Sequence, residues 1–252
     1  MHESEAATAA LPSAPVGWSP YALQFLSGDG RPCREPLSEC ARVPFESAVA
    51  VRSFPSFRGQ GNWPGLWWSA TMGCHVGYES WLERDHAMLL DFDAAVTGFA
   101  AQPFWLLFHG EDGTPRTHAP DFFARRADGT AVVVDCRPDD RIRPRDAEAF
   151  ATTERACDVV GWEYRRVGAA RSVLVENVRW LAGYRHPRFA QTATVEALLR
   201  AFADRRALFE GAQAAGPPLV VLPVLFHMLW RGQLHTLLDV PLSESSMVRA
   251  AP

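Results

Sequence analysis

The sequence predicts a mixed α/β fold followed by a smaller, mainly helical module. Short strand-like runs alternate with two helical segments between Ser47 and about Arg185. Asp-Gly pairs at 112–113 and 128–129 separate strand-like runs as hairpin turns. After Pro187 the pattern becomes mostly helical. A chain of 252 residues that is 48% hydrophobic can bury one large core or two smaller ones.

The N-terminal part of the chain shows no sustained hydrophobic periodicity. Residues 1–45 are rich in alanine, proline, serine and glycine, which is typical of a poorly ordered arm. The first folded domain is expected over 46–186. Within it, the helical spacing of apolar residues over Val76–Leu90 predicts an amphipathic helix with Glu79 and Glu83 four residues apart.

Several short apolar runs follow and are expected to build the sheet of this domain. The predicted strands are Val96–Phe99, Phe104–His109, His118–Arg126, Ala131–Cys136 and Trp162–Val167. A second helix is predicted at Arg145–Val160, between the last two strands. A short helix at Asn177–Tyr184 is expected to complete the domain.

The C-terminal module is expected over 187–252. Val195–Phe209 and Leu219–Trp230 predict two helices, which Gly216-Pro217-Pro218 separates. Leu234–Pro241 predicts a short strand. Two helices followed by a strand or wing fit a small winged-helix-like module, and the alternative is a helical hairpin that caps the first domain.

Composition excludes several classes of protein. No run approaches the roughly 18 apolar residues of a membrane span, and Glu3 and Glu5 do not fit a signal peptide, so we expect no membrane partner and a cytoplasmic location. The five scattered cysteines predict reduced thiols. A net charge of −4 argues against coating nucleic acid through bulk charge alone. All 25 basic residues are arginines, which excludes lysine chemistry.

Two aspartates stand out at predicted strand ends. Asp121 follows a proline, which favours a strand end or bulge where the side chain can face a cleft. Asp135 ends an apolar run, and a charged group there needs a partner, a metal or water. Arg137 should share a strand face with Asp135, while Cys136 points away. The alternative is an ion pair between Asp135 and Arg137 at an exposed strand end.

With Glu83 from the upstream helix, Asp121 and Asp135 form a set of three carboxylates suited to one or two Mg²⁺ ions. Metals in such a site activate water for attack on a phosphodiester and neutralise charge on the leaving oxygen. Arg137 can supply charge and bidentate phosphate hydrogen bonds, but a guanidinium stays protonated and cannot act as a base.

An arginine cluster follows the second acid. Its members are Arg137, Arg141, Arg143 and Arg145. They could grip phosphates beside the metal. The alternative is a solvated loop in which they pair with Asp139 and Asp140.

The motifs, taken in order, resemble the TnsA-like endonuclease subunit of heteromeric transposases, a member of the PD-D/ExK superfamily. The resemblance runs from about Val51 to Leu242. The matching segments are Glu79–Asp85 with Leu89–Asp93, Gln102-Pro103, His118–Phe123, Val133–Arg137, Asn177–Tyr184, Leu222–Gly232 and Leu238–Leu242.

This resemblance implies a restriction-endonuclease-like mixed β-sheet core flanked by helices. Glu83 would be the helix carboxylate, Asp121 the central metal ligand and Asp135 the second strand ligand, while Arg137 stands where family members have lysine. It also implies a Mg²⁺-dependent cut, with Mn²⁺ as a substitute, at the 5′ ends of a transposon. The implied partners are transposon-end DNA, an integrase-type transposase that joins the 3′ ends, and an ATPase regulator.

Two other functions stay open. The missing lysine motivates a non-catalytic assembly or DNA-binding module on a nuclease-like fold. The same acids would also serve a restriction- or repair-type nuclease unrelated to transposition.

Overall fold

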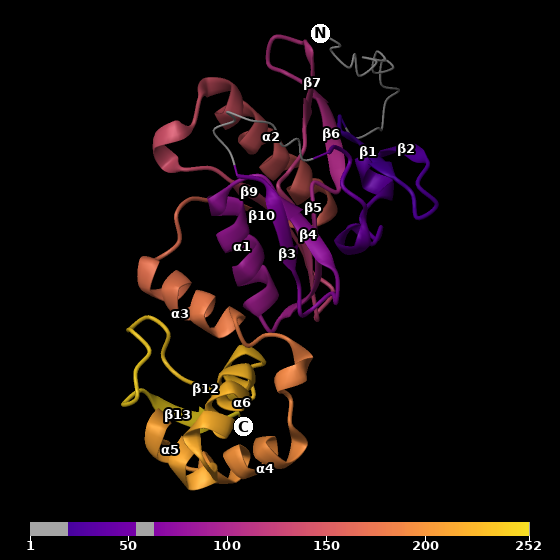
Figure 1. Ribbon diagram of the computed structural model, residues 1–252. Coiled ribbons are helices and arrows are strands. Elements are labelled where there is room, and N and C mark those ends of the chain that lie inside the picture. The colour runs from indigo at the N-terminus through magenta and orange to yellow at the C-terminus, as the bar shows by residue number, and fades with distance from the viewer. Residues whose placement is uncertain (1–19, 54–62, 252) are drawn as a thin grey trace.

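The computed structural model describes residues 20–53 and 63–251. An upper lobe holds the larger sheets, and a lower lobe, orange to yellow in Figure 1, is mainly helical. This mixed α/β architecture confirms the predicted fold class.

The upper lobe contains two four-stranded sheets. The central sheet has the order β10-β9-β8-β5 and consists of β10 (Glu163–Val167), β9 (Ala131–Cys136), β8 (Phe122–Arg126) and β5 (Val96–Ala101). Its β9 and β10 are parallel, whereas its other neighbours are antiparallel. The second sheet is antiparallel, has the order β2-β1-β6-β7 and consists of β2 (Pro32–Pro36), β1 (Ala22–Leu26), β6 (Phe104–His109) and β7 (Pro115–His118).

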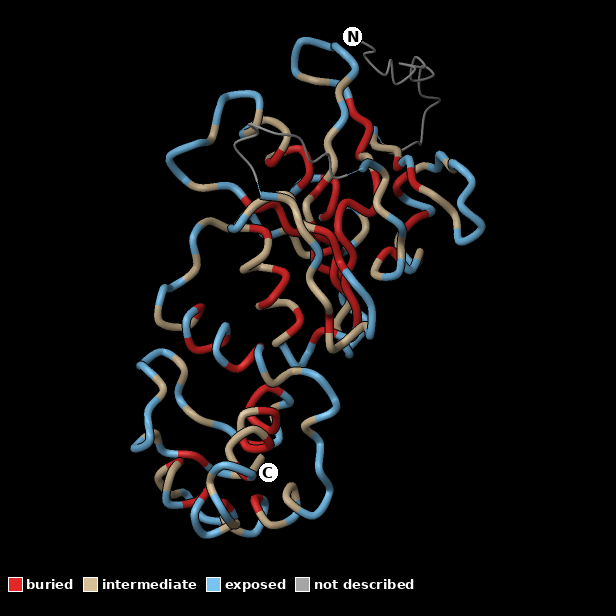
Figure 2. The backbone as a smooth tube through the Cα atoms, in the orientation of Figure 1, coloured by how far each residue is buried: buried red, intermediate tan, exposed pale blue. Residues whose placement is uncertain are grey.

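Strands β5, β8 and β9 of the central sheet are largely buried, as the red segments of Figure 2 show, whereas the edge strand β10 is partly exposed. Val133 packs toward the second sheet and α2 (Pro144–Val160), in a cluster that includes Ala156. Val134 packs in another cluster with Ala87 of α1 (Trp81–Phe92). Successive side chains of a strand alternate between faces. Asp135 therefore points to the α2 side of the sheet, and α1 covers the opposite side.

The prediction of a poorly ordered arm over residues 1–45 is wrong from Ala22 onward. Residues 1–19 lie outside the described ranges. Strand β1 pairs with β6, with Leu23 opposite Leu106. Leu23 and Phe25 are buried on either side of the exposed Gln24. This alternation covers too few residues to predict a strand, and its pairing partner is distant in sequence.

Helix α1 begins at Trp81, later than the predicted Val76. The chain before it forms β4 (His75–Tyr78), which pairs with β3 (Gly65–Trp68). Ser80 is the N-cap, and its Oγ accepts a hydrogen bond from the backbone N of Glu83 at 3.2 Å. The prediction that Glu79 and Glu83 share a helical face is wrong, because Glu79 precedes the helix.

Asp91, near the C-terminal end of α1, fastens the chain between β3 and β4 to the helix. Its carboxylate accepts hydrogen bonds from Trp67 Nε1, Ser69 Oγ and the backbone N atoms of Ala70 and Thr71, at 2.7–3.0 Å. The side chain is only 4% exposed. A buried carboxylate with four donors holds α1 and this hairpin in one arrangement.

The lower lobe contains three helices and a small sheet of order β11-β13-β12. Its elements are α4 (Thr192–Ala201), β11 (Arg206–Ala207), α5 (Leu208–Ala215), α6 (Pro218–Trp230), β12 (Leu234–His235) and β13 (Met247–Ala250). The predicted single helix over Val195–Phe209 is wrong, since this stretch spans α4, β11 and the start of α5. Gly211 allows α5 to pack directly on Phe202, because a Cβ at this position would lie 2.1 Å from the Phe202 ring. The predicted strand Leu234–Pro241 is shortened to β12.

Helix α3 (Ser172–Ala182) connects the lobes. Asn177 Nδ2 donates to the carbonyl oxygens of Leu238 and Val240 at 3.0 and 2.7 Å, so the β12–β13 loop is tied to α3. On the same helix, Arg179 forms an ion pair with Asp85 of α1.

Within the described ranges, no single helix has the length and apolar character to cross a bilayer. Helices α5 and α6 taken together would be long and apolar enough, but a bend of 120° separates them. All five cysteines are free, as predicted.

Candidate active site at the edge of the central sheet

Asp121 and Asp135 lie at the same edge of the central sheet. Strands β8 and β9 are antiparallel with Phe122 opposite Val134, which brings the start of β8 beside the end of β9. Asp121 Oδ2 accepts a hydrogen bond of 2.7 Å from the backbone N of Cys136. The single strand predicted over His118–Arg126 is wrong, because β7 ends at His118 and β8 begins after the Pro-Asp step.

The carboxylate of Asp135 is held by two side chains that the sequence analysis did not select. His118 Nε2 lies 2.9 Å from both carboxylate oxygens, and Tyr164 Oη donates to Oδ2 at 2.8 Å. Burial and then the charge of Asp135 raise the pKa of Tyr164, which keeps the phenol a donor. Asp135 is 2% exposed. No ion pair between Asp135 and Arg137 is recorded, and Arg137 is exposed.

Glu83 has a structural task at the start of α1. Its Oε2 accepts from the backbone N of Glu79 at 2.7 Å, and its Oε1 accepts from Ser80 Oγ at 2.8 Å. Together with the Ser80 N-cap bond, these hydrogen bonds tie the Glu83 side chain to the two residues that precede α1. Burial raises the pKa of Glu83, and the hydrogen bonds from Glu79 N and Ser80 partly oppose that shift.

The three predicted carboxylates share one electrostatic environment although they come from different elements. Burial first, and then the charges of Asp135 and Glu83, raise the pKa of Asp121 well above its ordinary value. The hydrogen bond from Cys136 N and the charge of Arg137 act in the opposite direction. A cation placed here would relieve the repulsion between these acids.

A cavity of about 200 Å³ opens beside the acids. Its walls include Asp121, Asp135, Arg137 and His118, and also Arg52, which the sequence analysis did not select. Arg52 reaches the cavity from the segment that precedes the hairpin of β3 and β4. The site thus combines buried acids with two guanidinium groups.

The predicted arginine cluster lies on the connection between β9 and α2, and all four side chains are exposed. Their expected alternative partner Asp139 pairs instead with Arg166 of β10. Across the residues that the structure describes, no ion pair is recorded for Arg137, Arg141, Arg143 or Arg145. Their pairing with Asp139 and Asp140 is not found.

The donor chemistry of the site fits a hard divalent cation, since Asp121 and Asp135 offer carboxylate oxygens at one sheet edge. Among the described residues, no three acidic, histidine or cysteine side chains form a ready-made metal site. Both oxygens of Glu83 already accept hydrogen bonds, so its direct binding to an ion would disrupt these bonds at the start of α1.

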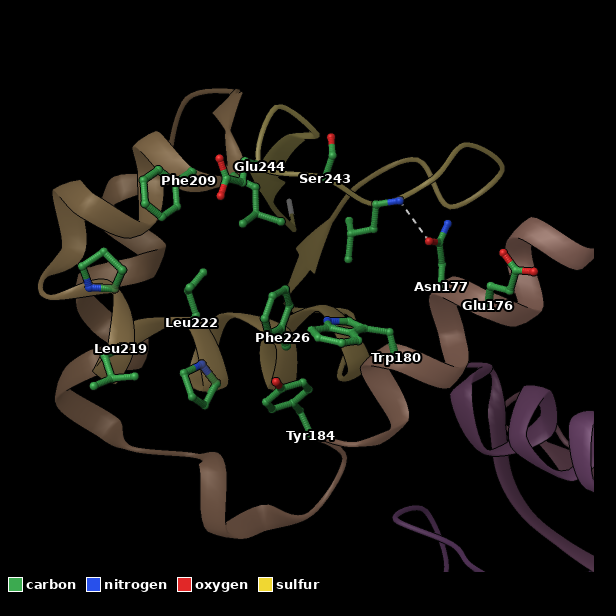
Figure 3. Close-up of a pocket in the computed structure, with 14 residues that line it drawn as sticks. Glu176, Asn177, Trp180, Tyr184, Phe209, Leu219, Leu222, Phe226, Ser243 and Glu244 are labelled. Atoms are coloured by element: carbon green, nitrogen blue, oxygen red, sulfur yellow. Dashed lines mark hydrogen bonds between the residues drawn. The ribbon is translucent and has the colours of Figure 1, made fainter.

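A larger, apolar cavity of about 600 Å³ lies in the lower lobe (Figure 3). Trp180, Tyr184 and Phe226 converge on it from α3, its C-terminal continuation and α6, with Glu176 and Glu244 on its border. It contains none of the predicted site residues. Of these two cavities, the smaller one beside Asp121 has the charged lining that polar chemistry requires.

Fold and site together define an α/β protein with an acidic cluster at a sheet edge and arginines beside it. Comparison of the chain with protein-family models and with curated proteins found no match. The function is therefore inferred from these side chains and their surroundings.

Proposed function

We propose that this protein is a Mg²⁺-dependent DNA endonuclease, the subunit of a heteromeric transposase that cuts phosphodiester bonds at the 5′ ends of a transposon. The observation that carries the proposal is the pair of acids at one sheet edge, Asp121 and the buried Asp135, which line a cavity together with Arg137. Burial first, and then the charges of Asp135 and Glu83, raise the pKa of Asp121. Perturbed carboxyl groups next to a cleft are typical of catalytic sites. The proposal implies transposon-end DNA and an integrase-type transposase as partners, and it allows an ATPase regulator as a further one.

The arrangement of elements supports the same proposal. A sheet with one parallel and two antiparallel pairings, covered by α1 and α2 on opposite faces, is compatible with a restriction-endonuclease-like core. In the lower lobe, the order helix, strand, two helices and hairpin is compatible with a winged-helix-like module.

Each side chain has a role in this proposal. Asp121 and Asp135 would hold the ion, which when bound supplies an activated water and neutralises charge on the leaving oxygen. His118 and Tyr164 orient the Asp135 carboxylate through their hydrogen bonds. Glu83 fixes the start of α1 beside the acids. Arg137 is exposed at the rim, where it can bind the non-bridging oxygens of the scissile phosphate.

The test is a cutting assay on end-labelled transposon-end DNA with Mg²⁺, with and without the transposase. We expect cuts at the 5′ ends with the transposase and weak cutting alone, because a chain of net charge −4 has little DNA affinity of its own. If cutting persists in Asp121→Ala, the proposal is wrong. Cutting of unrelated DNA without transposase would instead indicate a restriction- or repair-type nuclease.

Arg137→Lys is expected to keep the cutting rate near that of the wild type, because lysine retains the positive charge and is the smaller donor. Arg137→Gln, the matched neutral variant, should cut about 10²-fold more slowly. Single-turnover rates on the same DNA measure both. Equal rates for the glutamine variant and the wild type would show that Arg137 does not contact the reacting phosphate.

A non-catalytic module on a nuclease-like fold is the second candidate. It is favoured by the internal hydrogen bonds that already occupy both oxygens of Glu83 and of Asp135. Titration calorimetry with Mg²⁺ and Mn²⁺ separates the two candidates. Intact partner binding without any metal binding would favour the second.

A further inference from the structure

Arg52 is fixed at the wall of the acidic cavity by two side chains. Its Nε donates to Gln102 Oε1 at 2.9 Å, and its Nη2 donates to the carboxylate of Glu79. The side chain is nevertheless 41% exposed. Among the described residues, no hydrogen-bond partner is recorded for Nη1. The guanidinium is therefore held in place while part of it stays accessible beside Asp121.

Gln102 has an unusual backbone conformation that serves this arrangement. Its φ of 45° is the only positive φ of a non-glycine residue in the described chain. It is 1% exposed. Its backbone N donates to the carbonyl of Asp121 at 3.0 Å, and its carbonyl accepts from the backbone N of Val51 at 2.9 Å. A left-handed glutamine is strained and persists where the surroundings determine it, often at functional sites.

These contacts join Arg52 to Asp121 through a single residue. Gln102 bonds the backbone immediately before Arg52, the backbone of Asp121 and the Arg52 guanidinium. Gln102 Nε2 also donates to Glu79 Oε2 at 3.2 Å. The Glu79 carboxylate therefore contacts Arg52 and Gln102. These contacts account for a glutamate at this position, near Glu83, without a role as a metal ligand.

We propose that Arg52 is a second phosphate-binding residue of the cutting site, with Gln102 and Glu79 as its positioning residues. The inference rests on the proposed function and adds to it. Arg52 and Arg137 line the same cavity from distant parts of the chain. A guanidinium presents several donors in a planar fork that matches phosphate oxygens. Arg137 binds the scissile phosphate and Arg52 binds a neighbouring one, so two arginines orient the strand over the acids.

The test uses the full chain with its transposase, transposon-end DNA and Mg²⁺. Arg52→Gln should lower the single-turnover cutting rate about 10²-fold. The slope of log affinity against log salt is negative, and its magnitude should fall by about 0.9, the value for one lost phosphate contact. Arg52→Lys keeps the charge and should keep the salt slope. Gln102→Ala leaves the charge of Arg52 unchanged but removes the hydrogen bond that positions its guanidinium. This variant should therefore have a lower cutting rate and an unchanged salt slope.

The matched control is Arg126→Gln. Arg126 ends β8, whereas Asp121 precedes the start of this strand, and Arg126 pairs with Glu163. Rate and slope should both equal those of the wild type. Unfolding midpoints of all variants show whether the fold is intact, and Arg52→Lys can retain the pair with Glu79 if Arg52→Gln does not fold.

The outcomes separate the two levels of the proposal. If the wild type cuts and the folded Arg52 variants cut at its rate with its salt slope, the role of Arg52 is wrong and the nuclease stands. A lower rate in Arg52→Gln with an unchanged salt slope would also overturn phosphate binding. If the wild type neither binds nor cuts the DNA, the proposed function fails together with this inference.

Discussion

Replacing Asp121 by asparagine is expected to abolish DNA cutting and to stabilise the metal-free fold at the same time. The cutting rate should fall at least about 10³-fold, because the central carboxylate of the site is lost. The fold should gain stability at neutral pH, because asparagine cannot ionise next to Asp135 and Glu83. Its side-chain oxygen can still accept the hydrogen bond from Cys136 N.

The sign of the stability effect follows from the pKa of Asp121. Burial and neighbouring acids raise this pKa in the folded state above the ordinary value of 3.8. The contribution of the group to stability is therefore fully present below its unfolded pKa and is lost as the pH rises through the folded pKa. Asparagine removes this loss. At higher pH the variant should unfold at the higher temperature.

Thermal unfolding of both proteins across a pH series, without divalent ions, measures the effect. For a chain of this size, about 1 kcal/mol shifts the midpoint by roughly 2–4 °C. Added Mg²⁺ should stabilise the wild type and not the variant, since a bound ion favours the charged form of Asp121. Asp204→Asn, an exposed change in the lower lobe, is the control. Coincident pH profiles for the wild type and Asp121→Asn would contradict the prediction.

The largest loss of stability is expected for Asp91→Ala. The change removes the carboxylate that accepts hydrogen bonds from Trp67 Nε1, Ser69 Oγ and the backbone N atoms of Ala70 and Thr71. These four donors would then have no carboxylate acceptor in the protein interior. Each buried donor left without an acceptor costs about 1–3 kcal/mol, so the variant should lose several kcal/mol in total. This corresponds to a fall of roughly 10 °C in the unfolding midpoint. Differential scanning calorimetry measures it directly.

Asp93→Ala is the matched control for this prediction. Asp93 follows the same helix but is exposed, and its carboxylate accepts a hydrogen bond from Ala95 N. Its loss should cost no more than about 1 kcal/mol. Similar midpoints for the two alanine variants would show that the Asp91 network does not hold the hairpin.

Local sequence signals were sufficient where they were complete within one segment. The bounds predicted for β6 and β9 are confirmed, because each is an apolar run bordered by a turn. Gly113 and Gly129 have φ values of 76° and 85°, as the hairpins after β6 and β8 require. Helix α2 begins one residue before its predicted start and ends as predicted.

The misplaced elements depend on contacts between distant segments. Strand β1 is stabilised by β6, which lies much later in the chain. The break between α4 and α5 brings Gly211 into close packing against Phe202, and a helical pattern gives no sign of this contact. In both cases tertiary contacts outweigh local propensity.

The same limit applies to the site. Asp121 and Asp135 are visible in the sequence because one follows a proline just before an apolar strand and the other lies near the end of an apolar strand. His118 and Tyr164 become relevant only once β7, β9 and β10 are assembled. Arg52 and Gln102 could not be selected, since a left-handed glutamine has no local signature and its partners come from three separate segments.

The hydrogen bonds of Glu83 at the start of α1 have a consequence for how such chains diverge. This side chain fixes the start of α1 and its charge also acts on Asp121, so selection for folding alone is enough to keep a glutamate there. A related chain without the proposed nuclease activity would still retain it. Asp121 accepts a backbone hydrogen bond that asparagine could also accept, so folding alone does not select for a carboxylate at this position once the chemistry is lost. Among related chains, the residue at position 121, and not the one at position 83, should separate active nucleases from inactive descendants.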